Sequence, residues 1–137
     1  MKSLPIIIAL LVAPLCSLAD VPSCLVGLWK SDEELTLADM RKHPDVSERA
    51  KALFENKFFG RLVLVFGTRY IGSYFPGEPQ EQTKFEPVRV VDTGPNWVKV
   101  KYNLLGNDVF QHWGCDKGKI YSVVSKWEFR EYFSPLP

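Results

Sequence analysis

Arg130 and Tyr132 are the residues with the clearest capacity for ligand chemistry. They are two positions apart in the last predicted strand, so their side chains point to the same face. A guanidinium and a phenol directed into one apolar cavity would hold a carboxylate through charge-assisted hydrogen bonds. The alternative is a packing role, in which Arg130 stacks on Trp29 and Tyr132 fills space. The sequence leaves both interpretations open.

The histidines and cysteines give little support for catalysis. His43 adjoins Pro44 at a predicted helix end, and His112 is three residues before Cys115 on a predicted strand. That odd separation places His112 and Cys115 on opposite faces, where they cannot share a metal or act as nucleophile and base. The chain has no Cys-x-x-Cys, no His-x-x-x-His and no glycine-rich phosphate loop. We therefore expect a non-enzymatic protein with no metal and no other cofactor.

Residues 1–19 have the pattern of a secretory signal peptide. Lys2 precedes an apolar stretch over 6–13, and Ser17-Leu18-Ala19 supplies small residues at the positions that a signal peptidase requires, with cleavage before Asp20. The alternative is a lipoprotein acylated on Cys16, but Leu15 is a poor residue for the preceding position. We expect a secreted or periplasmic protein without a membrane anchor after cleavage.

The charge of residues 20–137 is balanced. The sequence has 17 basic residues, of which Lys2 lies in the signal peptide, and 16 acidic residues. A neutral domain without a basic block has no electrostatic footprint for nucleic acid or an anionic membrane. The expected partners are a small hydrophobic ligand or another protein.

Cys24 and Cys115 remain as an even pair after removal of Cys16. In an exported chain this pair predicts a disulfide bond, with two free thiols as the alternative.

The segment 20–137 is predicted to form one mainly β domain, an up-and-down antiparallel barrel of about eight strands with a helix pair between the first and second strands. Capping pairs place the first helix start at Ser31 or Thr36 and the second at Asp45. The helices are expected to cover one face of 62–66, which is apolar on both sides. Whether the last strand continues its predecessor or follows a turn stays open. The expected strands are 25–30, 62–66, 70–75, 85–91, 97–103, 109–115, 120–124 and 127–133.

The opening Gly27-Leu28-Trp29 and the closing Arg130-Glu131-Tyr132 resemble the two ends of calycin barrels, which include the lipocalins and fatty-acid-binding proteins. The resemblance implies that Trp29 plugs the closed end of the barrel beside Arg130, so that Gly27, Trp29 and Arg130 are structural. Arg130 and Tyr132 are also similar to the Arg-x-Tyr pair that grips a ligand carboxylate in the fatty-acid-binding branch. The order of strand, helix pair and meander is closest to that branch.

We therefore expect an exported non-enzymatic protein that binds a small apolar or amphipathic, fatty-acid-like ligand. The predicted ligand-binding residues are Arg130, Tyr132, Tyr102 and Phe110. An eight-stranded barrel is only wide enough to be filled by side chains or to hold one small ligand. A filled barrel would instead be an interaction or inhibitor module that uses the polar loop 76–81 or an uncovered strand.

Overall fold

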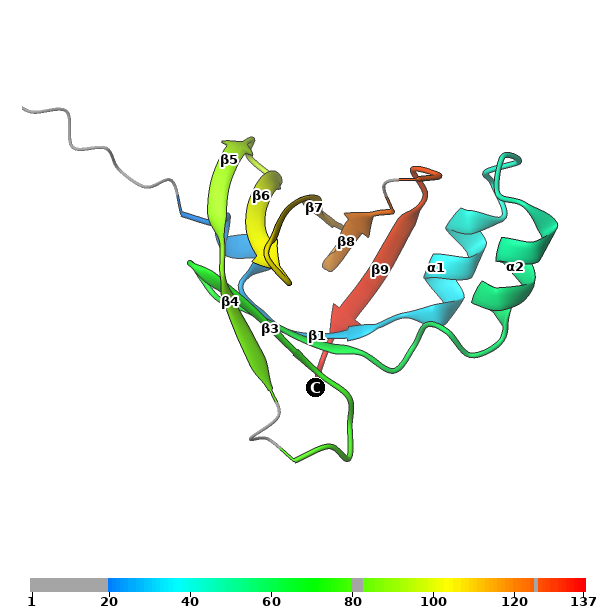
Figure 1. Ribbon diagram of the computed structural model, residues 1–137, viewed down its shortest axis with the longest axis horizontal. Helices are drawn as coiled ribbons and strands as arrows, with labels where there is room; N and C mark the ends of the chain where they lie inside the picture. Colours follow the sequence, from blue (N-terminus) through cyan, green and yellow to red (C-terminus); the bar gives the residue numbers. More distant parts are fainter. Residues whose placement is uncertain (1–19, 80–82, 125) are drawn as a thin grey trace, which may run out of the picture.

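In the computed structural model, which describes residues 20–79, 83–124 and 126–137, nine strands form one antiparallel sheet that curls into a nearly closed barrel (Figure 1). A helix pair follows the first strand, as predicted. The predicted signal peptide, 1–19, and residues 80 and 81 of the predicted rim loop lie outside the described residues. The strands are β1 (Gly27–Ser31), β2 (Val63–Phe66), β3 (Tyr70–Tyr74), β4 (Lys84–Pro87), β5 (Arg89–Thr93), β6 (Trp97–Leu104), β7 (Asn107–Asp116), β8 (Lys119–Val123) and β9 (Arg130–Pro135), and the helices are η1 (Ser23–Leu25), α1 (Glu33–Met40) and α2 (Glu48–Glu55).

The predicted eight strands become nine because β4 and β5, predicted as one strand, are separate. Only Val88 lies between them. β4 pairs with β3 and β5 pairs with β6, so the chain passes from one edge of the sheet to the other at this residue. Pro87 has no N–H to donate, and the N–H of Val88 donates instead to the carbonyl of Arg69 at 2.9 Å. The covalent chain therefore spans the gap between the two edges at this corner.

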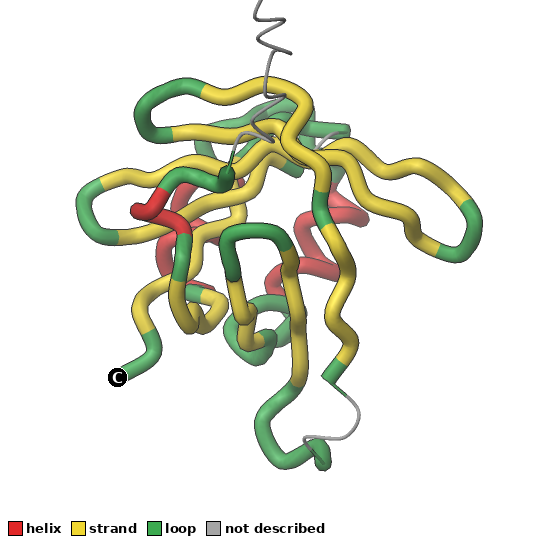
Figure 2. The backbone as a smooth tube through the Cα atoms, turned by 90° about the vertical axis from the view of Figure 1, so that its left-hand side faces the viewer, coloured by secondary structure: helices red, strands yellow, loops and turns green. Residues whose placement is uncertain are grey.

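The helix pair joins β1 to β2, and the other consecutive strands that lie side by side are joined by turns or loops, which Figure 2 shows between the strand segments. The sheet order is β4-β3-β2-β1-β9-β8-β7-β6-β5. β8 ends at Val123 and β9 begins at Arg130, so the last strand is separate from its predecessor.

The first and last strands meet through backbone pairing. Trp29 of β1 lies opposite Pro135 of β9, and the N–H of Leu136 donates to the carbonyl of Leu28 at 3.0 Å. Gly27 opens β1 with a φ of +151°, a conformation that L side chains rarely adopt. The predicted disulfide between Cys24 and Cys115 is confirmed, and it joins η1 to β7.

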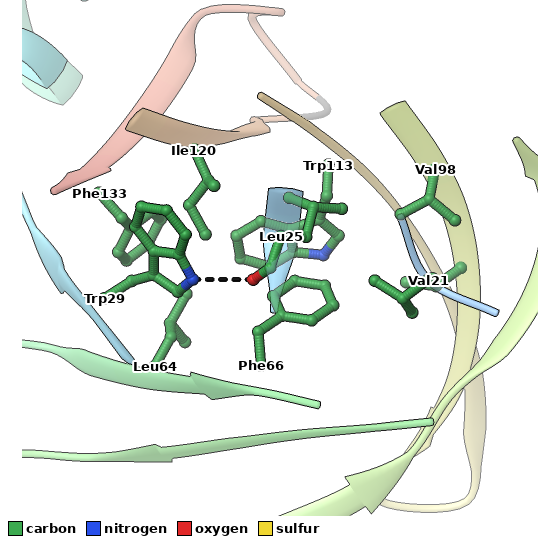
Figure 3. Close-up of a cluster of buried hydrophobic side chains, with 10 residues drawn as sticks. Val21, Leu25, Trp29, Leu64, Phe66, Val98, Trp113, Ile120 and Phe133 are labelled. Atoms are coloured by element: carbon green, nitrogen blue, oxygen red, sulfur yellow. Dashed lines mark hydrogen bonds between the residues drawn. The ribbon is translucent and has the colours of Figure 1, made fainter. Parts of the chain in front are cut away.

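A cluster of buried apolar side chains fills the part of the barrel into which η1 reaches (Figure 3). Within it, the indole N–H of Trp29 donates to the carbonyl of Leu25 at 2.8 Å, the dashed bond in Figure 3. This bond ties β1 to η1 and satisfies a buried donor. The opening tryptophan thus lies inside the barrel, as the resemblance implies. We call this set the core cluster; it consists of Val21, Leu25, Trp29, Leu64, Phe66, Val98, Val100, Trp113, Ile120 and Phe133.

The helix pair packs beside β9, with α2 beyond α1 (Figure 1). α1 takes the place of a neighbouring strand there, because the backbone N–H groups of Arg130 and Tyr132 donate to Asp39 Oδ2 at 2.7 Å and to Thr36 Oγ1 at 2.9 Å. In the described residues the helix pair thus packs mainly against β9, whereas the sequence predicted that it covers β2. A second apolar cluster joins the helices to the segment before β9, and it contains Leu37, Met40, Val46, Phe54, Phe59 and Phe129.

Both helices begin close to the predicted caps but use other residues. Asp32 caps α1 by accepting from the N–H of Leu35 at 3.1 Å, and Ser47 caps α2 by accepting from the N–H of Ala50 at 3.2 Å. Ser31, a predicted cap, instead accepts from the N–H of Gly60 at 2.8 Å. Its side chain is buried at the end of β1, so it serves the loop that returns from the helices.

Candidate ligand-binding site

The core cluster fills one part of the barrel. Next to it lies a partly open cavity of about 290 Å³. Leu64, Trp113 and Phe133 belong both to the core cluster and to the cavity lining, so they form the floor between the two parts. The sequence left a filled and a hollow barrel as alternatives, and the structure has packed side chains next to this cavity. The remaining lining residues are Leu62, Ile71, Gly72, Ser73, Lys84, Glu86, Tyr102, Gln111, Ser122 and Glu131.

Strand alternation places the polar lining above this floor. Along β6, Val98 and Val100 enter the core cluster, and Tyr102 reaches the cavity from the same face. The hydroxyl of Tyr102 donates to Gln111 Oε1 at 3.2 Å, and burial raises the pKa of this tyrosine above its ordinary value. One wall of the cavity is therefore an ordered hydrogen-bonded pair.

Glu131 is the ionisable group held deepest in the lining. It lies directly opposite Ser122 in the β8–β9 pair, and Ser122 is only 3% exposed. Burial raises the pKa of Glu131 to about 7, because the charged carboxylate loses solvation there. Among the described residues its carboxyl has no hydrogen bond or ion pair. This carboxyl is thus poised to ionise near neutral pH and lacks a protein partner in the described chain.

Two further charges reach the cavity from β4, Lys84 and Glu86. Lys84 is an exposed residue and Glu86 is half-buried. The lining also contains a donor without a partner: the indole nitrogen of Trp113 is buried and makes no hydrogen bond within the described residues. Buried polar atoms of this kind are rare in folded proteins and call for an explanation.

Of the four predicted ligand-binding residues, Tyr102 lines the cavity and the other three do not. Arg130 and Tyr132 alternate with Glu131 and Phe133 along β9, and the latter two face the cavity. Phe110 is on the outer face as well, 53% exposed. The predicted position of these three side chains in the pocket is therefore wrong.

The predicted contact between Trp29 and Arg130 is also wrong. Trp29 lies inside the barrel opposite Pro135, at the far end of β9 from Arg130. The guanidinium of Arg130 lies instead over the ring of Tyr121 on the outer face, 3.9 Å from the ring centre. The cation–π contact that the sequence suggested exists, but with a different aromatic partner.

Tyr121 belongs to a row of outer side chains that crosses four strands. His112 stacks on Trp97, with ring centres 5.3 Å apart, and its other neighbour is Tyr121 at 6.4 Å. Tyr121 in turn contacts Tyr132 at 5.9 Å. Burial, followed by the charges of Arg130 and Lys99, lowers the pKa of His112 below its ordinary value. A neutral ring sandwiched between aromatic side chains serves packing.

Sequence reasoning missed Glu131, although it lies between the two residues that were predicted. The available signal was Phe133, because a large apolar residue on β9 is a stronger candidate for the interior than Tyr132. Placing Phe133 inside would have placed Glu131 inside too. Burial of the Glu131 carboxyl costs free energy, as does burial of the Arg130 guanidinium. The sequence pattern alone therefore did not indicate which of the two faces the interior.

Comparison with known proteins adds no relative to this picture. No family model, curated protein or solved structure matches this chain. The nearly closed antiparallel barrel, with its helix pair after the first strand, is compatible with a calycin-like fold. The cavity and its lining are therefore the basis for assigning a function.

The described residues contain neither a metal-binding group nor a membrane-spanning helix. No group of three or more His, Cys, Asp or Glu side chains there could hold a metal ion. Within the same part of the chain, no helix combines the length and apolar character needed to cross a membrane. What the cavity offers chemically is an apolar floor, an ordered Tyr102–Gln111 pair and one desolvated carboxyl.

Proposed function

We propose that the protein is an exported, non-enzymatic binding protein that holds a small apolar or amphipathic molecule in a calycin-like barrel. The observation that carries this proposal is the cavity itself, with Leu64, Trp113 and Phe133 beneath polar side chains. Ligand pockets have volumes of about 300–1,000 Å³ and combine apolar walls with a few polar groups. A cavity of about 290 Å³ lies at the lower limit of that range, so the ligand is a small one.

Export is supported by two independent features. Residues 1–19 have the composition of a signal peptide. The Cys24–Cys115 disulfide is of the kind that persists in oxidising compartments, such as the periplasm or the extracellular space. The proposed location is one of these two.

The alternative of a filled barrel acting as an interaction module depended on an interior packed with side chains. The cavity argues against that premise. Arg130 and Tyr132 do not anchor a fatty-acid carboxylate in this cavity, because neither residue lines it. The polar end of the ligand has to be recognised by other groups.

The test is uptake of the neutral fluorescent probe N-phenyl-1-naphthylamine by the 20–137 protein after delipidation. We expect saturable binding with enhanced probe emission. Ser73→Phe should abolish binding, because Ser73 lines the cavity and the larger side chain would occupy it. Tyr74→Phe on the same strand is the matched control, since Tyr74 has the opposite orientation. Absence of binding by the unsubstituted protein, or equal binding by the Ser73→Phe variant, would refute the proposal.

A further inference from the structure

The charged groups that line the cavity bear on which polar head group its ligand has. We propose that its ligand is a small amphipathic amine, whose ammonium group pairs with the carboxylate of Glu131 while its apolar part lies on the floor of Leu64, Trp113 and Phe133. This inference rests on the proposed function and narrows it to a ligand class. It also departs from the fatty-acid-like ligand that the sequence suggested.

The first argument is the balance of charges around the cavity. Two carboxyl groups, Glu131 and Glu86, and one ammonium group, Lys84, contribute to its lining. Lys84 is exposed and makes no ion pair with either carboxyl in the described part of the chain. Arg130 cannot neutralise Glu131 directly, because it lies on the other side of β9 over Tyr121. A cationic ligand therefore meets a favourable field, and an anionic ligand meets an unfavourable one.

The second argument is the surroundings of the Glu131 carboxyl. Ser122 lies directly opposite on β8, where its hydroxyl can accept a second hydrogen bond from an ammonium. Trp113, Phe133 and Tyr102 supply aromatic side chains in the same lining, and aromatic rings attract cations. An ammonium can thus gain a charge-assisted hydrogen bond, a neutral hydrogen bond and an aromatic neighbour within one small cavity.

The third argument is proton linkage. Burial raises the pKa of Glu131 to about 7, and the other ionisable lining groups are Lys84 and Glu86 from β4 and Tyr102 from β6. An ammonium favours the ionised form of Glu131, so amine binding should strengthen as the pH rises through 7. A carboxylate ligand favours the protonated form and should show the opposite trend. A primary amine with a pKa of about 10 stays charged throughout this range.

The experiment compares octylamine, 1-octanol and octanoate, which share one chain and differ in the head group. Their dissociation constants are measured by isothermal titration calorimetry with the 20–137 protein at pH 6, 7 and 8. With a Glu131 pKa of about 7, the ionised fraction rises about tenfold between pH 6 and pH 8. We expect octylamine to bind about tenfold more tightly than 1-octanol at pH 8. Its affinity should fall by up to tenfold at pH 6, whereas that of 1-octanol stays constant.

Glu131→Gln should reduce octylamine binding to the level of 1-octanol and remove the pH dependence. Glu128→Gln is the matched control, because Glu128 carries the same charge three residues away, is exposed and does not line the cavity. The pH profile of the unsubstituted protein gives the same information if the Glu131→Gln variant does not fold.

The outcomes separate the two proposals. If none of the three probes binds, the proposed function fails together with this inference. If 1-octanol or octanoate binds and octylamine binds no more tightly, the cavity is a ligand site but the amine preference is wrong. Unchanged octylamine affinity in a folded Glu131→Gln variant would likewise overturn the role of Glu131.

Discussion

The guanidinium of Arg130 lies over the ring of Tyr121, 3.9 Å from its centre, on the outer face of the barrel. Its Nη1 atom also donates to the hydroxyl of Tyr132 at 3.5 Å. Because side chains alternate along a strand, a β9 that directs Arg130 and Tyr132 outward must direct Glu131 inward. The contact of Arg130 with Tyr121 on the surface is thus linked to the position of Glu131, which faces the cavity.

Arg130→Ala should lower the free energy of unfolding by about 1 kcal/mol, because a partly exposed cation–π contact contributes on that scale. The side chain is 42% exposed, so its ion pair with Asp116 at 4.0 Å adds little. Urea denaturation measures the change, and Arg130→Lys should recover part of the loss. Binding of octylamine should stay unchanged. A loss of affinity equal to that of Glu131→Gln would contradict the outward placement of Arg130.

Glu131 should make the protein less stable as the pH rises. Its pKa is about 7 in the folded protein and near 4.5 in the unfolded chain, so its stabilising contribution is complete below pH 4.5 and lost as the pH passes through 7. Glu131→Gln removes this dependence. Between pH 5 and pH 8 the difference in unfolding free energy should shift by about 2.5 kcal/mol in favour of the variant. Urea titrations at both pH values measure it, and a constant difference would contradict the raised pKa.

Replacing Cys24 and Cys115 with serine should lower the unfolding free energy by about 4 kcal/mol, because the bond closes a long loop in the unfolded chain. The two cysteines are 91 positions apart in the sequence. Denaturation with and without dithiothreitol measures the effect. The reductant should destabilise the unsubstituted protein and leave the double variant unaffected. Equal sensitivity of both proteins would show that the disulfide is not the origin of the difference.

Trp29→Phe should cost about 2–3 kcal/mol. The change removes the N–H that bonds to the carbonyl of Leu25 and leaves a void among buried side chains. Trp97→Phe is the matched control, since Trp97 stacks on His112 at the half-buried outer face. That variant should lose less than about 1 kcal/mol. Thermal unfolding followed by circular dichroism gives both values, and equal losses would argue against a central role for Trp29.

Gly114→Ala should destabilise the barrel by about 1–3 kcal/mol through crowding. The added Cβ would meet the ring of Tyr121, which lies directly opposite and covers this glycine. In a Tyr121→Ala background the same change should cost much less, because the ring is gone. A double-mutant cycle measured by urea denaturation tests this coupling. Additive effects would indicate that the two residues do not touch.

Much of the architecture could be predicted from local patterns. Alternating apolar residues marked the strands, and capping pairs placed two helices between the first and second of them. The even pair of cysteines that remains outside the predicted signal peptide indicated the Cys24–Cys115 disulfide correctly. These features depend on neighbouring residues or on composition, so they are readable without knowing which elements touch.

The sequence-based prediction was wrong where two local arrangements fitted the residue pattern about equally well. The sequence did not reveal that the strand over 85–91 divides at Val88, because that division depends on which strands pair on either side of it. Nor did it distinguish the two faces of β9, since each carries one charged and one aromatic side chain: Arg130 with Tyr132, and Glu131 with Phe133.

By itself the sequence determined an antiparallel barrel with an inserted helix pair and a disulfide, because strand periodicity, caps and cysteine pairing are properties of short segments or of counts. The tertiary structure alone decided that Arg130 stacks outward on Tyr121 and that Glu131 enters the cavity. The physical reason is that the packing of all the side chains of a strand together determines which of its faces points into the barrel. Phe133 packs into the core cluster and Arg130 stacks on Tyr121, and the residues that these two side chains contact come from other elements of the fold.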